Sequence, residues 1–240
     1  MTGQPLVLLA PSEDKAPGGH PGNLPETPAQ RWVRERLHEL VVHGTPEAQA
    51  RAFAAHGAAL DQAKAEALAL HHSVPLLPAL ERYRGVAFEA LGAGSLDREK
   101  WHQVYVLSSL RGLVRGDELV PPYKLKLGGM PGLKKHWLQH LQPDLRGLPE
   151  GPVWELLPKD HSDLLKGWPR VRHSVEIVDD QGRTITHFSK KYRGLVARWI
   201  LTHDQGDPAR VLRGKIPGCR WNGAVDNGSG GRCLGLVVLP

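Results

Sequence analysis

The sequence contains little cysteine and no long apolar run near its start. Its two cysteines, Cys219 and Cys233, are not spaced as a Cys-x-x-Cys pair, so neither a disulfide framework nor a zinc site is predicted. Residues 1–10 hold an apolar run of about five residues without a basic flank, which is typical neither of a secretory signal peptide nor of a membrane-spanning helix. We therefore expect a cytoplasmic protein that contacts no membrane.

Acidic residues are missing from one strongly basic stretch, residues 183–198. It carries five cations, namely Arg183, Lys190, Lys191, Arg193 and Arg198. The whole chain has 31 Lys and Arg against 25 Asp and Glu, a formal charge of +6. Local positive charge of this kind favours an anionic partner through electrostatic attraction. The alternative is a basic helix face that is simply solvated.

Internal repeats and long linkers are also absent, and strand and helix patterns alternate along the chain. Apolar runs predict strands at residues 6–10, 104–107, 153–157, 171–178, 184–188, 220–222 and 233–239, and amphipathic patterns predict helices at residues 27–43, 60–72, 132–141 and 190–203. Residues 179–182, Asp-Asp-Gln-Gly, are typical of a hairpin turn. The alternation predicts an α/β (α+β) fold: a single domain over residues 1–240, with a mixed β-sheet flanked by helices.

Residues 108–128 combine basic side chains with turn residues, and we interpret them as the site loop. Arg111, Arg115, Lys124 and Lys126 surround two acids in this stretch. Glycines and prolines fix where the backbone turns, so the charged side chains are held on a defined scaffold. We expect this loop to meet the basic stretch, because two converging basic clusters would bind phosphate.

Acidic side chains near these cations are candidates for chemistry. Asp117 and Glu118 lie within the site loop, and Ser12 and Glu13 follow the first predicted strand, where open α/β sheets place ligand-binding groups. A carboxylate among cations stays ionised and can act as a general base, or stabilise a cationic transition state in glycosidic bond cleavage. It can equally orient the arginines through salt bridges, and residues 11–19 can equally form an ordinary polar loop.

Six blocks of the sequence occur in a recognisable order. They are Leu-Val-Leu-Leu-Ala-Pro-Ser-Glu-Asp-Lys at 6–15, Tyr-Arg-Gly-Val-Ala-Phe-Glu-Ala-Leu at 83–91, Ser-Leu-Arg-Gly-Leu-Val-Arg at 109–115, Pro-Tyr-Lys-Leu-Lys-Leu-Gly at 122–128, Ser-Lys-Lys-Tyr-Arg-Gly-Leu-Val-Ala-Arg at 189–198 and Val-Val-Leu-Pro at 237–240. The ordered set spans nearly the whole chain and resembles the YaaA family of peroxide-stress proteins, as a divergent, actinobacterial-type member.

The resemblance implies a single α/β domain with a positively charged cleft and a helix-hairpin-helix-like element. It also implies a protein that binds DNA and limits oxidative damage when peroxide and free iron rise. By position, the family's basic motif corresponds to Lys15, Arg115, Tyr123, Lys124, Lys190, Lys191, Arg193 and Arg198. We predict no cofactor and no metal, and a monomer is favoured.

The chain departs from the family pattern at several positions of the expected cleft. These are Arg111 in place of an aromatic residue, Arg115-Gly116-Asp117-Glu118 in place of Arg-Pro-x-Asp, and Lys159, Asp160 and His161 in place of a Ser-x-x-Tyr-like segment. A divergent member can keep the fold and take another ligand. The rival prediction is therefore an enzyme that acts on a nucleoside, nucleotide or nucleobase, for example by N-glycosidic bond cleavage.

The leading prediction is a cytoplasmic DNA-binding protein of the peroxide-stress type, and a third reading is a scaffold whose basic face serves solubility only. Phosphate contacts are assigned to Ser12, Lys15, Arg111, Arg115, Lys124, Lys126, Lys190, Lys191, Arg193 and Arg198, and Tyr123 is assigned to stacking on a base. In the rival enzyme, Glu118, Asp117 or Glu13 supplies the acid or base. Binding alone would tolerate Glu118→Gln, whereas catalysis by Glu118 would not.

Overall fold

The largest element of the fold is a seven-stranded sheet in the order β5-β4-β1-β7-β8-β10-β9. The computed structural model describes residues 3–185, 189–204 and 206–239. The strands of this sheet are β1 (Leu6–Leu9), β4 (Val104–Ser108), β5 (Gly112–Arg115), β7 (Val153–Leu156), β8 (Arg172–Val178), β9 (Cys219–Asp226) and β10 (Arg232–Val238). Strands β4, β1, β7, β8 and β10 run parallel, and β5 and β9 are antiparallel edge strands. The predicted α/β class with a mixed sheet is confirmed.

The first strand of the chain lies in the middle of this sheet. All four residues of β1 are buried, as a parallel strand covered on both faces requires. Val7 lies beside Val104 of β4 on one side and Trp154 of β7 on the other. The chain therefore builds the sheet outward from β1 in two opposite directions, first to β4 and later to β7. Open α/β sheets bind ligands at such a reversal, outside the carboxyl ends of the strands.

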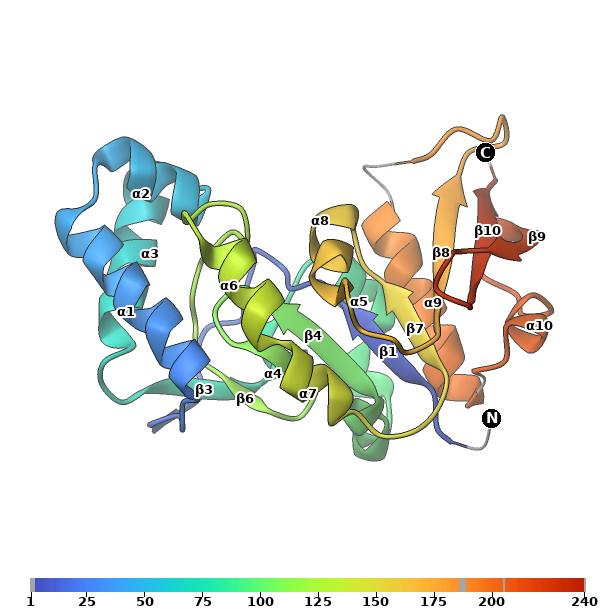
Figure 1. Cartoon of the computed structure of the whole chain (residues 1–240), viewed down its shortest axis with the longest axis horizontal. Helices are drawn as coiled ribbons and strands as arrows, with labels where there is room; N and C mark the ends of the chain where they lie inside the picture. Colours follow the sequence, from blue (N-terminus) through green and yellow to red (C-terminus); the bar gives the residue numbers. More distant parts are fainter. Residues whose placement is uncertain (1–2, 186–188, 205, 240) are drawn as a thin grey trace.

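Helices flank both faces of the main sheet. They are α5 (Val86–Leu91), α6 (Leu133–His140), α7 (Gln142–Arg146), α8 (Lys159–Ser162), α9 (Ser189–His203) and α10 (Pro208–Val211). The short helix α4 (Ala79–Arg82) instead contacts the small sheet described below. Figure 1 shows α6 and α7 on the near side of β4 and α9 behind β7. Helices α5 and α9 approach closely because Gly194 has no side chain; a Cβ there would collide with the carbonyl oxygen of Ala87. The helices predicted at residues 132–141 and 190–203 are confirmed.

A second group of helices lies at the end of the molecule opposite β9 and β10 (Figure 1). It contains α1 (Pro28–His43), α2 (Pro46–Phe53) and α3 (Gly57–Ala69), and a small antiparallel sheet is formed by β2 (His20–Gly22), β3 (Val74–Pro78) and β6 (Leu119–Val120). Thr27 begins α1 with a capping box, in which its Oγ1 accepts the Gln30 N–H at 3.2 Å and Gln30 Oε1 accepts the Thr27 N–H at 3.0 Å. Gln30 Nε2 also donates to Arg111 O at 2.9 Å, which ties α1 to the β4–β5 turn.

A fully buried arginine, Arg82, joins segments that are distant in sequence. Its guanidinium donates to the carbonyl oxygens of Val120 at 3.1 Å, Gly18 at 2.9 Å, Pro75 at 2.8 Å and Ala16. These hydrogen bonds offset the cost of burying the charge without a carboxylate. The loop after β1 is therefore anchored to β3 and β6.

One predicted strand is not formed as expected. Within the described residues of the segment 184–188, Thr184 makes only an isolated bridge with Val178, and residues 186–188 lie outside the described part. The hairpin turn before it does form, because Asp179 Oδ1 accepts the N–H groups of Gln181 at 3.0 Å and Arg183 at 2.8 Å. Strand β9 extends on both sides of the predicted residues 220–222, and most of its side chains are exposed.

Cys219 and Cys233 are free thiols that lie in β9 and β10. Across the described part of the chain, no helix has both the length and the apolar character that a membrane crossing needs.

Candidate functional site

A cavity of about 470 Å³ opens at the carboxyl ends of β1 and β7. This is the place where the order of the strands reverses, so its position is the one expected for a ligand site. We name it the switch-point pocket. Its walls come from residues 9–14, from residues 84–88, from Leu156, Pro158 and Lys159, and from Thr184, Ile185, Ser189, Lys190 and Arg193.

Four basic side chains line the switch-point pocket without a carboxylate partner. They are Arg84, Lys159, Lys190 and Arg193, and within the described residues none of these side chains forms an ion pair or a hydrogen bond. Arg193 is partly buried, and this burial lowers its pKa with no acid to compensate. Burying part of a guanidinium without a partner costs free energy of folding. An anion that enters the pocket can therefore pair with this charge without first displacing a carboxylate of the protein.

The remaining walls of the switch-point pocket combine helix termini with apolar surface. Ser189 and Lys190 belong to the first turn of the 15-residue helix α9, where the helix dipole adds partial positive charge. Val86 and Phe88 of α5 and Leu9 of β1 supply apolar surface. An apolar wall with a few charged groups is the usual composition of a small-molecule site.

The polar loop after β1 forms one wall of the pocket. Its shape is set by Ser12, whose Oγ donates to Asp14 O at 2.6 Å and accepts the N–H of Arg84 at 3.1 Å. The Ser12 hydroxyl, predicted to contact phosphate, is thus engaged within the protein. Glu13 is exposed and lines the same pocket.

A second cluster lies beside the carboxyl end of β4, and we name it the Lys15 cluster. Ser108 Oγ lies 2.8 Å from Tyr123 OH, which lies 2.9 Å from Tyr83 OH. Lys15 Nζ donates to Ser12 O at 3.0 Å and lies 4.0 Å from the centre of the Tyr123 ring. Burial raises the pKa of both tyrosines, so their hydroxyls stay protonated. Burial also lowers the pKa of Lys15 to about 7.

The predicted stacking role of Tyr123 is wrong for this structure. Its side chain is only 2% exposed, and the Lys15 amine covers one ring face. Tyr123 is held inside because its hydroxyl completes the chain to Ser108 and Tyr83. A nucleobase therefore has no free face of this ring to stack on.

Arg111 lies apart from the switch-point pocket. It is only 7% exposed, and Nη2 donates to Pro25 O at 3.3 Å. It lines a smaller hollow beside α1, together with the ion-paired Arg34 and Glu26. Burial lowers the pKa of Arg111, and Glu118 and Glu26 partly oppose this shift.

The structure places Arg115, Asp117 and Glu118 at the other edge of the sheet. Because β5 runs antiparallel to β4, Arg115 lies opposite Tyr105, near the amino end of β4. Arg115 Nε contacts Asp117 Oδ1 at 2.5 Å, and Glu118 Oε2 accepts the Arg115 N–H at 2.9 Å. Burial alone would raise the pKa of Asp117, but the Arg115 guanidinium lowers it overall. We name these residues the Arg115 turn; in it the acids orient the arginine, and the site loop does not meet Lys190 there.

Of the other predicted cations, some are exposed to solvent and one is hydrogen-bonded within the protein. Lys126 and Lys191 are exposed, and Lys124 is partly exposed and close enough to Lys15 to lower the pKa of that amine. Arg198 donates through Nη1 to Leu91 O at 2.9 Å and Gly92 O at 3.1 Å, so it caps α5.

Two residues of the switch-point pocket escaped sequence reasoning. Arg84 was not a candidate, and Lys159 stood out only as a departure from a family pattern. The position of Lys159 directly after a buried strand is the signal that points to it. His161, two residues on, has no partner for either ring nitrogen among the described residues, and burial lowers its pKa to about 4.

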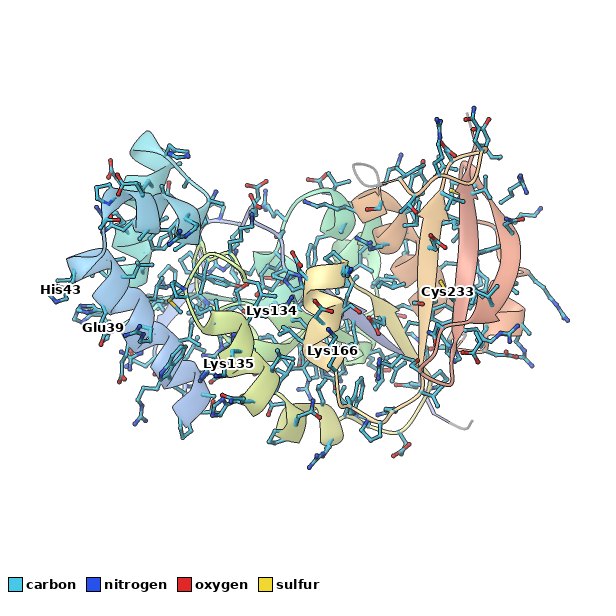
Figure 2. All side chains as sticks on the ribbon, turned by 45° about the horizontal axis from the view of Figure 1, so that its top comes forward. Glu39, His43, Lys134, Lys135, Lys166 and Cys233 are labelled. Atoms are coloured by element: carbon cyan, nitrogen blue, oxygen red, sulfur yellow. The ribbon has the colours of Figure 1, made fainter. Side chains whose placement is uncertain are left out.

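Two lysines near the pocket but outside it are paired with an acid. Lys134 of α6 and Lys166, both labelled in Figure 2, contact Asp163, which directly follows α8, at 2.8 and 3.0 Å. Hydrogen bonds from these two lysines lower the pKa of Asp163 to about 2. By contrast, Lys159 and Lys190 form no ion pair within the described residues, although Glu13 and Asp14 line the same pocket.

Comparison with known sequences places the chain among bacterial relatives. A family model described as "Peroxide stress protein YaaA" matches residues 6–223. A UPF0246 protein of Corynebacterium efficiens is 31% identical over 230 residues, covering 87% of this chain and 92% of the relative. A UPF0246 protein of Corynebacterium glutamicum is 27% identical over 219 residues, covering 83% of this chain and 86% of the relative. An uncharacterized protein of Campylobacter jejuni is 30% identical over 137 residues, covering 51% and 52%.

Proposed function

Because the chain belongs to the peroxide stress protein YaaA family, we propose that it serves in peroxide stress by binding DNA, and that the switch-point pocket holds a phosphorylated nucleotide unit of that DNA. One observation carries this proposal: four cations line the pocket and none is neutralised by a carboxylate of the described chain. Phosphate is the anion that such a set fits, since arginine binds it through two parallel hydrogen bonds and lysine adds point charge.

The size and walls of the pocket suit one nucleotide better than a duplex. Its volume of about 470 Å³ falls within the usual range for small-ligand sites. The apolar side chains Val86 and Phe88 offer surface for a sugar or base, while Arg193 and Lys190 take the phosphate. The nucleotide therefore enters as a strand end or an extruded unit, and the neighbouring phosphates meet cations outside the pocket.

Exposed cations supply those outer contacts in the proposal. Lys191 on α9 and Lys126 in the site loop have no acid partner within the described residues. Their contribution is independent of sequence and screened by salt. We assign the helix-hairpin-helix-like element to α2 and α3, which are joined by residues 54–56 alone.

A carboxylate in the same pocket favours a second candidate function. Glu13 lines the switch-point pocket, whereas Asp117 and Glu118 are engaged at the Arg115 turn. A carboxylate placed beside the sugar of a bound nucleotide can assist N-glycosidic bond cleavage by stabilising positive charge on the sugar. This enzyme would require Glu13, and phosphate binding alone would not.

The test compares a pocket variant with a matched variant at the Arg115 turn. Binding of duplex DNA, single-stranded DNA and a nucleoside monophosphate is followed across salt concentrations, and released base is assayed in the same mixtures. We expect Lys190→Ala with Arg193→Ala to weaken binding of all three and to flatten the salt dependence by about two phosphate contacts. Arg115→Ala should change neither.

Each outcome of this test decides between the candidates. Equal loss of binding in both variants would overturn the pocket assignment, because it would mean that charge alone matters. Base release by the native protein that disappears in Glu13→Gln would favour the enzyme, and base release that survives in Glu13→Gln would exclude Glu13 from that role.

A further inference from the structure

Lys15 is held in an unusual environment for a lysine. It follows β1, the central strand, and pairs with Tyr83 through an isolated antiparallel bridge. Its amine donates to the carbonyl oxygen of Ser12 at 3.0 Å and lies over the faces of Tyr123 and Tyr83, at 4.0 and 5.4 Å from the ring centres. Within the described chain, no carboxylate forms an ion pair with it.

The surroundings of Lys15 favour its neutral, nucleophilic form. Burial is the main cause that brings its pKa to about 7, and the nearby charge of Lys124 acts in the same direction. The carboxylates of Glu66, Asp14 and Glu13 raise the pKa but do not outweigh burial. At pH 7 about half of such amines are uncharged, against well under 1% for an ordinary lysine. Lys134 and Lys100 differ, because each forms an ion pair with an aspartate. A neutral amine is the form that attacks carbonyl carbon.

Hydroxyl groups lie beside this amine in a continuous chain. Ser108 Oγ, Tyr123 OH and Tyr83 OH are linked at 2.8 and 2.9 Å, and Ser108 Oγ also accepts the N–H of Arg111 at 3.1 Å. The tyrosines remain protonated, so the chain can give a proton to a departing oxygen and take one back. An amine and a proton relay together are what carbonyl condensation requires.

The Lys15 cluster adjoins the switch-point pocket through a shared residue. Ser12 lines the pocket, and its carbonyl oxygen is the acceptor that positions the Lys15 amine. Tyr83 of the cluster precedes Arg84 and Gly85, which also line the pocket. Residues 12–14 line the pocket and Lys15 follows them directly, so the residue that carries the amine continues the pocket wall.

We propose that the Lys15 amine forms an imine with the aldehyde of a phosphorylated pentose, either free ribose 5-phosphate or the sugar of an abasic position in DNA. The nitrogen lone pair attacks the aldehyde carbon to give a carbinolamine, whose hydroxyl takes a proton and leaves as water while the C=N bond forms. One water is released and no oxidant or reductant is consumed. The phosphate preference rests on the function proposed for the switch-point pocket; the reactivity of the amine does not.

The experiment traps the imine with borohydride on the full-length protein. Samples contain ribose 5-phosphate, a duplex with one abasic position, or glyceraldehyde as an aldehyde without phosphate. We expect covalent capture of a phosphorylated probe, seen for the sugar phosphate as a mass gain equal to its mass less one oxygen, and located at Lys15 by peptide mapping. Capture of only the free sugar, or only of abasic DNA, identifies which source is bound.

Variants separate this inference from the proposed function. Lys15→Ala and the charge-retaining Lys15→Arg should both lose capture at least tenfold, whereas Lys134→Ala should keep it; circular dichroism verifies that each is folded. The rate in the native protein should rise with pH through about 7 as the amine loses its proton. Absence of capture by both phosphorylated probes, or equal capture in folded Lys15→Arg, would overturn the inference.

The glyceraldehyde sample tests the role of phosphate. Slower capture of glyceraldehyde than of ribose 5-phosphate, with the difference removed by Arg193→Ala, supports both claims. Equal capture of the two at Lys15 would overturn the phosphate preference and the function proposed for the pocket, while leaving the reactive amine established.

Discussion

The switch-point pocket and the Arg115 turn carry similar sequence composition but opposite electrostatic organisation. At the turn, Arg115 contacts Asp117 and its backbone N–H is bound by Glu118, so charge serves to fix a β-connection. In the pocket, Arg193 and Lys190 have no acid partner in the described chain. Paired cations stabilise the protein that holds them, whereas unpaired, partly buried cations cost stability until a ligand arrives. In the proposed function, therefore, the absence of an ion pair rather than the number of cations distinguishes the binding surface.

The largest expected effect on stability and binding comes from disrupting the packing of α5 against α9, the two helices that carry part of the pocket wall. Gly194→Ala places a Cβ against the Ala87 carbonyl oxygen and should force α9 away from α5, lowering the free energy of unfolding by about 3 kcal/mol. Nucleotide binding should be lost as well. Thermal unfolding and binding are measured on the same sample. Gly147→Ala is the control, because its added Cβ meets only ordinary contacts at 3.5 Å; equal stability of both variants would contradict the close packing.

A second prediction concerns the pH dependence of stability and the imidazole of His161, two residues after the pocket residue Lys159. Since the folded chain holds the pKa of His161 at about 4, below its usual 6.5, the unfolded chain takes up this proton first as pH falls. The free energy of unfolding should therefore decrease by about 2 to 3 kcal/mol between pH 6.5 and pH 4. His161→Phe should remove this contribution and leave those of His71, His136 and His173, whose pKa burial also lowers, whereas His20→Ala should keep the His161 contribution. Urea unfolding at a series of pH values measures the difference.

A third prediction sharpens the comparison at the level of single arginines. Arg193→Met should weaken nucleotide binding roughly tenfold to a hundredfold, the range expected for charge-assisted hydrogen bonds, and should leave stability unchanged or higher. Arg115→Met should do the reverse, with binding unchanged and stability lower. Calorimetric binding and chemical unfolding test both variants. A loss of stability in Arg193→Met would mean that this side chain has a structural partner.

The smallest effect is expected from the ion pair of the turn itself. In a double-mutant cycle of Arg115→Ala and Asp117→Ala, the coupling should be about 0.5 kcal/mol, because the pair is partly solvated. The same cycle measured on DNA binding should give no coupling. A coupling in binding would show that the turn contacts nucleic acid and would remove the contrast with the pocket.

The sequence predicts local elements of this fold well, because their causes are local. The apolar run at β1, the Thr27 cap of α1 and the amphipathic pattern of α9 each follow from neighbouring residues. The pairing of β1 with β4 and β7 was not predictable from the sequence. Several predicted strands are equally apolar, and each could form the backbone hydrogen bonds and cover the side chains of β1 equally well. The length of β9 was underestimated because this edge strand has mostly exposed side chains and contains no continuous apolar run.

The candidate site was also predictable only where its signal is local in the sequence. Lys190 and Arg193 stood out as cations without nearby acids in the sequence, and the structure leaves them unpaired in the pocket. Arg115 was assigned to the same surface, but the antiparallel return of β5 carries it to the opposite edge. The burial of Tyr123 depends on Ser108 and Tyr83, which come from separate segments, so no local pattern indicates it.

The central position of β1 also has a consequence for synthesis on the ribosome. β1 is complete once residue 9 has been made, yet β4 ends at residue 108 and β7 at residue 156 of 240. At roughly 5 to 20 residues per second, β1 waits on the order of ten seconds before both of its neighbours exist. The strand that leads into both the switch-point pocket and the Lys15 cluster is therefore translated well before its neighbours. The backbone N–H and C=O groups along its two edges stay without their native partners until β7 has been made.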